Sequence, residues 1–152
     1  MTVTKKNKKK RLKRCKVNQR MIMKATDYLI TQLKSEGFSV MRYDSITTNS
    51  VYLKLDDGVG GSIRISDHEG KKQYSYKYNL IKGNALTKLI DGKGIERFYF
   101  PMREIELLIK KVIYDREQIL IKYGQRNYQK FMERNRIKGA SKEGFWKCAR
   151  YM

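Results

Sequence analysis

The spacing of hydrophobic residues changes twice along the chain and divides it into helical and extended parts. From about residue 17, apolar side chains recur at intervals of three and four, which predicts an amphipathic helix over roughly 16–36. Between residues 38 and 80, apolar and polar residues alternate, as in strands with one buried face. A helical period returns over about 102–122, directly after Pro101, which suits the first position of a helix. Helical character resumes at 125–138.

The alternating part predicts an antiparallel meander of about four short strands, followed by one further strand. The expected strands cover 38–44, 51–55, 62–66, 74–80 and 96–100. Asp-Gly and Gly-Gly pairs supply turns because they adopt positive φ at low cost. Residues 84–90 fit either a short helix or an extended connection. The predicted fold class is α+β, an antiparallel sheet of four to five strands flanked by an N-terminal helix and a long C-terminal helix.

The only histidine of the chain, His68, ends the central turn-strand-turn stretch that begins at Gly60. With Asp67 and Glu69 it forms the one cluster that resembles a catalytic set, because a carboxylate can orient a histidine base. The sequence supplies neither a second histidine nor an evident carboxylate cluster for a metal-dependent nuclease. It also has no P-loop and no zinc-ligand spacing. We therefore expect a structural or partner-binding turn, no catalytic residue, no cofactor and no enzymatic activity.

The formal net charge of +20 lies mainly at the two ends of the chain. Residues 1–24 hold eleven Lys or Arg and no acid, and residues 122–152 hold nine with two acids. Like charges at this density repel one another, so we expect a basic disordered arm over 1–15, with a continuous rod of arm and helix as the alternative. The expected division continues with an α+β core over 16–122 and a basic, aromatic helical extension over 123–152.

Such basic ends predict a partner rich in phosphates, or an acidic protein surface. Tyr128, Phe131 and Trp146 interleave the C-terminal cations, which favours RNA or single strands. Tyr74, Tyr76 and Tyr78 either pack beneath a helix, which is the more common case, or stack on bases. The predicted binding residues are Lys8, Lys9, Lys10, Arg11, Lys13, Arg14, Arg64, His68, Arg126, Lys130, Arg134 and Arg136.

The chain begins with a charged segment and has no apolar stretch of the length that a signal peptide or a membrane span needs. Cys15 and Cys148 are isolated from each other in sequence, as expected for two free thiols. These features predict a cytoplasmic protein.

The hexapeptide Ile63-Arg64-Ile65-Ser66-Asp67-His68 resembles part of a phage anti-CRISPR inhibitor of type II systems. In that family a strand ends in an Arg-hydrophobic-Ser-polar-His turn, matched here by Arg64, Ser66 and His68, and a basic arm and a long amphipathic helix flank the sheet. The resemblance implies a phage-encoded, non-enzymatic inhibitor that acts in the bacterial host cell. Its partner would be a type II CRISPR effector nuclease in its guide RNA-loaded form, with RNA phosphates as the anchor. The alternative is a general nucleic-acid-binding regulatory protein of a phage or plasmid.

Overall fold

A computed structural model describes residues 5–46, 48–66, 75–81, 94–141 and 145–152. It contains one antiparallel sheet of six strands in the order β5-β4-β3-β2-β1-β6. The strands are β1 (Val40–Asp44), β2 (Val51–Leu55), β3 (Ser62–Ile65), β4 (Tyr76–Ile81), β5 (Ile95–Phe100) and β6 (Arg150–Tyr151). The expected α+β class is confirmed, and the sheet has one strand more than predicted because the C-terminal residues pair with β1.

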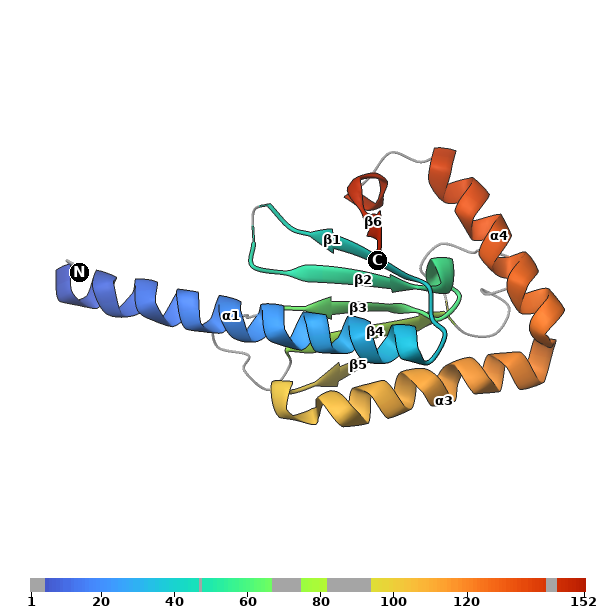
Figure 1. Cartoon of the computed structure of the whole chain (residues 1–152), viewed down its shortest axis with the longest axis horizontal. Helices are drawn as coiled ribbons and strands as arrows, with labels where there is room; N and C mark the ends of the chain where they lie inside the picture. The colour runs from blue at the N-terminus through green and yellow to red at the C-terminus, as the bar shows by residue number, and fades with distance from the viewer. Residues whose placement is uncertain (1–4, 47, 67–74, 82–93, 142–144) are drawn as a thin grey trace.

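Within the described residues, three α-helices lie against one face and one end of the sheet (Figure 1), and three short 3-10 turns connect other elements. The helices are α1 (Lys5–Ser35), α3 (Ile105–Tyr123) and α4 (Gln125–Ser141), and the turns are η1 (Asp56–Gly58), η3 (Met102–Glu104) and η4 (Phe145–Cys148). Helices α1 and α3 run along the sheet, whereas α4 crosses its end beside η1 (Figure 1). None of the helices, within the described part of the chain, is long and apolar enough to cross a membrane.

The N-terminal residues form a longer helix than the hydrophobic period predicts. Helix α1 is continuous from Lys5, so the disordered arm expected over 1–15 is not what the structure shows from residue 5 onward. Lys and Arg have high helix propensity, and no Gly or Pro interrupts 5–35. The alternative of one continuous rod describes α1 correctly, and its first turns project beyond the sheet (Figure 1).

The hydrophobic core lies between one face of the sheet and helices α1 and α3. Alternate side chains of β2, β3 and β4 are buried, and Leu29 and Leu33 of α1 and Leu108 and Val112 of α3 pack against them. Tyr76 and Tyr78 are fully buried in this core, which confirms the core interpretation for these two residues. Tyr74, together with the segment 84–90, lies outside the described residues.

Gly61 lies at a position with no room for a side chain. Its replacement by alanine is expected to lower the free energy of unfolding by about 3 kcal/mol. Its φ is +93°, and a Cβ atom would lie 2.5 Å from the carbonyl oxygen of Asn79 and 2.8 Å from the ring of Tyr78. Both groups belong to β4 and cannot move without disturbing the sheet. The measurement is urea unfolding followed by circular dichroism.

Gly139→Ala is the matched control. No atom lies within 4 Å of the added Cβ at this position in α4, and alanine is the better helix former. We expect it to raise the free energy of unfolding by up to about 1 kcal/mol. A Gly61→Ala protein as stable as the unchanged chain would show that β4 does not approach Gly61 as described.

Candidate nucleic-acid interface

The sheet face that points away from α1 and α3 carries a row of aromatic and basic side chains. Side chains alternate between the faces of a strand, so residues next to the buried ones point outward. Cross-strand pairing places five of them side by side, one from each of β1 to β5: Tyr43, Tyr52, Arg64, Lys77 and Tyr99. A second row holds Met41, Lys54, Ser62, Asn79 and Arg97. We call these ten residues the open sheet face; Arg97 and Tyr99 are exposed, and the other eight are half-buried.

Three cations lie on neighbouring strands of the open sheet face: Arg64 of β3, Lys77 of β4 and Arg97 of the edge strand β5. Burial lowers the pKa of Lys77, and the positive charges of Arg64 and Arg97 lower it further. Within the described residues, none of the three forms an ion pair with a carboxylate, and the Nε of Arg64 lacks a hydrogen-bond partner. Uncompensated positive charge of this kind favours an anion from outside the chain.

Aromatic rings flank Arg64 and Lys77 on both sides of their row. The centroids of Tyr43 and Tyr52 are 6.2 Å apart, and that of Trp146 in η4 lies 6.5 Å from Tyr52 in an edge-on arrangement. Tyr99, which pairs with Lys77 at the other end of the row, is 47% exposed. A basic sheet surface bordered by aromatic rings can hold phosphates and stack on unpaired bases.

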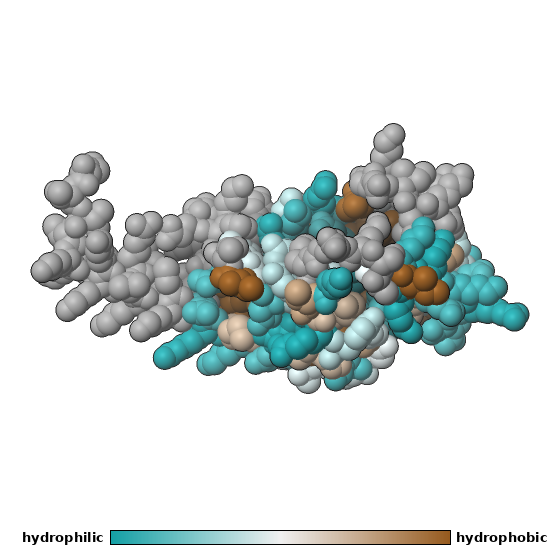
Figure 2. Space-filling model, turned by 90° about the horizontal axis from the view of Figure 1, so that it is seen from above, coloured by the Kyte–Doolittle hydropathy of each residue, from teal (hydrophilic) through white to brown (hydrophobic). Residues whose placement is uncertain are grey.

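One view of the described surface is mainly polar. Seen from above, hydrophilic residues cover most of the described surface, and hydrophobic residues form small, separate patches (Figure 2). Large contiguous apolar patches are the usual mark of protein-docking surfaces. The polar character of this side agrees with a charged partner.

Two adjacent acids in η1 attach the C-terminal part of the chain to the sheet. Asp56 and Asp57 are both buried and both have positive φ, at 50° and 54°. One carboxylate oxygen of Asp56 accepts a hydrogen bond from the backbone N–H of Ser39 at 2.8 Å, and the other accepts one from the hydroxyl of Tyr128 at 2.5 Å. Burial raises the pKa of Asp56, and these two hydrogen bonds oppose that increase.

Asp57 forms the second attachment. Its carboxylate accepts hydrogen bonds from Arg136 of α4 at 3.0 Å and from the hydroxyl of Tyr151 in β6 at 2.6 Å. The sequence interpretation assigned the acidic pair only to turn chemistry, and missed its role in holding α4 and β6. Two neighbouring acids in so basic a chain were the available signal.

The structure separates the two predicted basic ends. Lys8, Lys9, Lys10, Arg11, Lys13 and Arg14 lie in the part of α1 that projects beyond the sheet, and α4 lies at the opposite end of the molecule (Figure 1). The side chains of residues 8–14 and all of His68 lie outside the described part. Of the predicted residues, only Arg64 belongs to the open sheet face.

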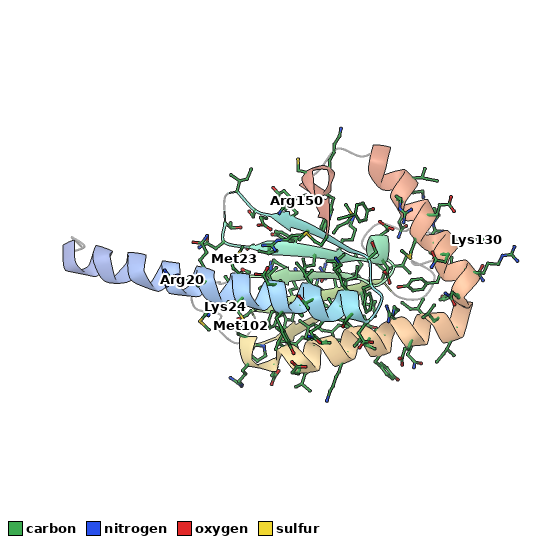
Figure 3. All side chains as sticks on the ribbon, in the orientation of Figure 1. Arg20, Met23, Lys24, Met102, Lys130 and Arg150 are labelled. Atoms are coloured by element: carbon green, nitrogen blue, oxygen red, sulfur yellow. The ribbon has the colours of Figure 1, made fainter. Side chains whose placement is uncertain are left out.

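The four predicted cations of α4 do not form one cluster. Arg126 and Lys130 are exposed, and Lys130 extends outward from the helix (Figure 3). Arg134 stacks over the ring of Phe131 at 5.3 Å, and Arg136 pairs with Asp57. The predicted set did not include Lys77, Arg97 and the outward-facing tyrosines, which strand pairing places on the same face as Arg64.

No family model matches the sequence, and comparison with curated proteins and with solved structures also finds no match. Within the described residues, no group of three or more His, Cys, Asp and Glu side chains is arranged to hold a metal ion. Cys148 is an exposed free thiol. Function is therefore inferred from the geometry of the open sheet face.

Proposed function

We propose that this protein binds single-stranded nucleic acid, RNA in particular, on the open sheet face and does so without catalysing a reaction. The observation that carries the proposal is the trio Arg64, Lys77 and Arg97, which no carboxylate neutralises among the described residues. The phosphates of a strand would supply the missing negative charge, because charge-assisted hydrogen bonds to phosphate are strong and Arg suits them well.

The dimensions of the row support a single strand. Neighbouring strands of a sheet lie about 4.8 Å apart, so a row across five strands is about 19 Å long. Sheets of four strands in RNA-binding domains stack two or three bases, and this row has similar width. A duplex offers phosphates to the cations but keeps its bases stacked, so the tyrosines would gain nothing from it.

The resemblance at Arg64 adds a narrower proposal, in which the RNA is the guide held by a type II CRISPR effector. The basic N-terminal turns of α1 project beyond the end of the sheet and would offer a second site for phosphates. A general phage or plasmid regulator is the alternative, and it would bind nucleic acid in the absence of any nuclease. The two alternatives are distinguished by measuring DNA cleavage by a guide-loaded nuclease with and without the protein. Only an inhibitor is expected to reduce guide-directed cleavage.

The test of the general proposal is fluorescence anisotropy with labelled single-stranded RNA, single-stranded DNA and duplex RNA of equal length. We expect the single strands to bind at least 10-fold more tightly than the duplex at 150 mM salt, because stacking contributes about 1–3 kcal/mol per base. Equal affinity for duplex and single strand, or no binding at 50 mM salt, would contradict the proposal. The length of the RNA after incubation, read on a gel, checks that no cleavage occurs.

A further inference from the structure

A pocket lies at the corner of the sheet where β1 and β2 meet α4, η4 and β6. Its volume is about 300 Å³, at the lower end of the range for small-molecule sites. Lys54 and Met41 of the open sheet face form one side, and Arg136, Trp146, Lys147 and Tyr151 are among the residues that form the others. The pocket is therefore continuous with the open sheet face through β2.

The charges that line the pocket do not balance. Lys54, Arg136 and Lys147 bring three positive charges, and Asp57 brings one negative charge. Asp57 already accepts hydrogen bonds from Arg136 and Tyr151. Its negative charge is therefore largely used within the protein. Burial lowers the pKa of Lys54, and the charge of Asp57 only partly opposes this. An anion in the pocket would stabilise the protonated form of Lys54.

The pocket also has an aromatic wall. Trp146 is the only tryptophan of the chain, and the Nζ of Lys54 lies 4.6 Å from its ring centroid. Tyr52 of the open sheet face meets the same ring edge-on. The pocket therefore offers a planar hydrophobic surface beside a concentration of positive charge, and a nucleotide has both a planar base and a phosphate.

We infer that this pocket binds the phosphate monoester and base of one nucleotide, either a free mononucleotide or the phosphorylated end of a strand on the open sheet face. The second form rests on the proposed function, whereas the first does not. The phosphate lies among Lys54, Lys147 and Arg136, and the base packs against Trp146. A volume of about 300 Å³ suits one nucleotide rather than several.

Trp146 makes the inference directly measurable, because all tryptophan fluorescence of the protein comes from this wall of the pocket. We expect adenosine 5′-monophosphate to change the emission in a saturable manner. Adenosine and inorganic phosphate should bind at least 10-fold more weakly, since each lacks one half of the recognised chemistry. Equal affinity for adenosine and its monophosphate, or no saturable change with either, overturns the inference.

The two sources of the phosphate are separated with oligonucleotides of one sequence that carry either a 5′-phosphate, a 3′-phosphate or only hydroxyl ends. If the pocket receives a strand end, one phosphorylated strand binds about 10-fold more tightly than the hydroxyl strand. If it receives free nucleotides alone, the three strands bind equally while adenosine 5′-monophosphate still saturates the pocket.

Lys147→Ala tests the assignment at an exposed position of η4, and Lys54→Met tests it inside the pocket while keeping the length of the side chain. Each is expected to weaken adenosine 5′-monophosphate binding about 10-fold, whereas Lys110→Ala, at an exposed position of α3 outside the pocket, leaves it unchanged. Unfolding midpoints show whether each variant is folded, and unchanged nucleotide affinity in both folded pocket variants overturns the inference.

The inference and the proposed function fail in different ways. If hydroxyl-ended strands bind and neither free nucleotide nor terminal phosphate has an effect, the pocket inference is wrong and strand binding stands. If adenosine 5′-monophosphate saturates the pocket but no strand binds, the proposed function is wrong and the pocket stands.

Discussion

Replacement of Asp56 by alanine is expected to lower the free energy of unfolding by about 3–5 kcal/mol. The variant leaves two groups without their partner, the backbone N–H of Ser39 and the hydroxyl of Tyr128, and each unsatisfied buried group costs about 1–3 kcal/mol. Alanine must also adopt the φ of +50° that aspartate tolerates better, at a cost of about 1 kcal/mol. Urea unfolding monitored by circular dichroism measures the loss.

Asp56→Asn separates the hydrogen bonds from the charge. Asparagine accepts positive φ and keeps an oxygen for the N–H of Ser39, while the hydroxyl of Tyr128 can accept from the new amide instead of donating. Since burial raises the pKa of Asp56, the charged carboxylate is less favourable there than in water, and its loss costs little. We expect this variant to lie within about 1 kcal/mol of the unchanged protein. If Asp56→Ala were as stable as the unchanged protein, the hydrogen bonds of Asp56 would not be what holds α4 to η1.

The helices and the core strands could be predicted from the sequence because each has a local pattern of hydrophobic residues. The apolar period over 16–36 identifies the buried side of α1: Ile22, Leu29 and Leu33 are in the core, although Met21 and Tyr28, which share the period, are exposed. The alternation around Ile63 and Ile65 identifies β3 and places Arg64 on its other side, as the register confirms. Such patterns indicate which side of a helix or strand is buried. They do so whichever element of the fold packs against that side.

The features that define the site depend on pairing between distant parts of the chain. Strand β6 has two residues and no period of its own, and it pairs with β1 across most of the sequence. The hydrogen bonds to the acids of η1 come from Tyr128 and Tyr151, which are 72 and 94 residues away. The row of side chains from Tyr43 to Tyr99 exists only because five strands pair in one register, which alternation in a single strand cannot specify.

The largest effect on binding is expected when Arg64, Lys77 and Arg97 are replaced together by glutamine. Each contact between a charged side chain and a phosphate contributes about 1 kcal/mol or more, so loss of all three should weaken single-stranded RNA binding about 100-fold at low salt. The slope of log affinity against log salt concentration provides a second measurement, independent of the affinity itself. Each neutralised phosphate of a single strand adds about 0.7 to the slope of log affinity against log salt, so the slope should become shallower by about 2.

The matched control removes the same net charge from the helices that cover the other face, through Lys34→Gln, Arg103→Gln and Lys110→Gln. All three side chains are exposed. If long-range attraction alone drives binding, the two triple variants weaken it equally, because both carry a net charge of about +17 in place of +20. If the open sheet face holds the strand, the control retains affinity within about 3-fold at 150 mM salt, where charges more than about 8 Å away are screened. Equal losses in both variants would therefore place the binding surface elsewhere and leave the open sheet face without a role in it.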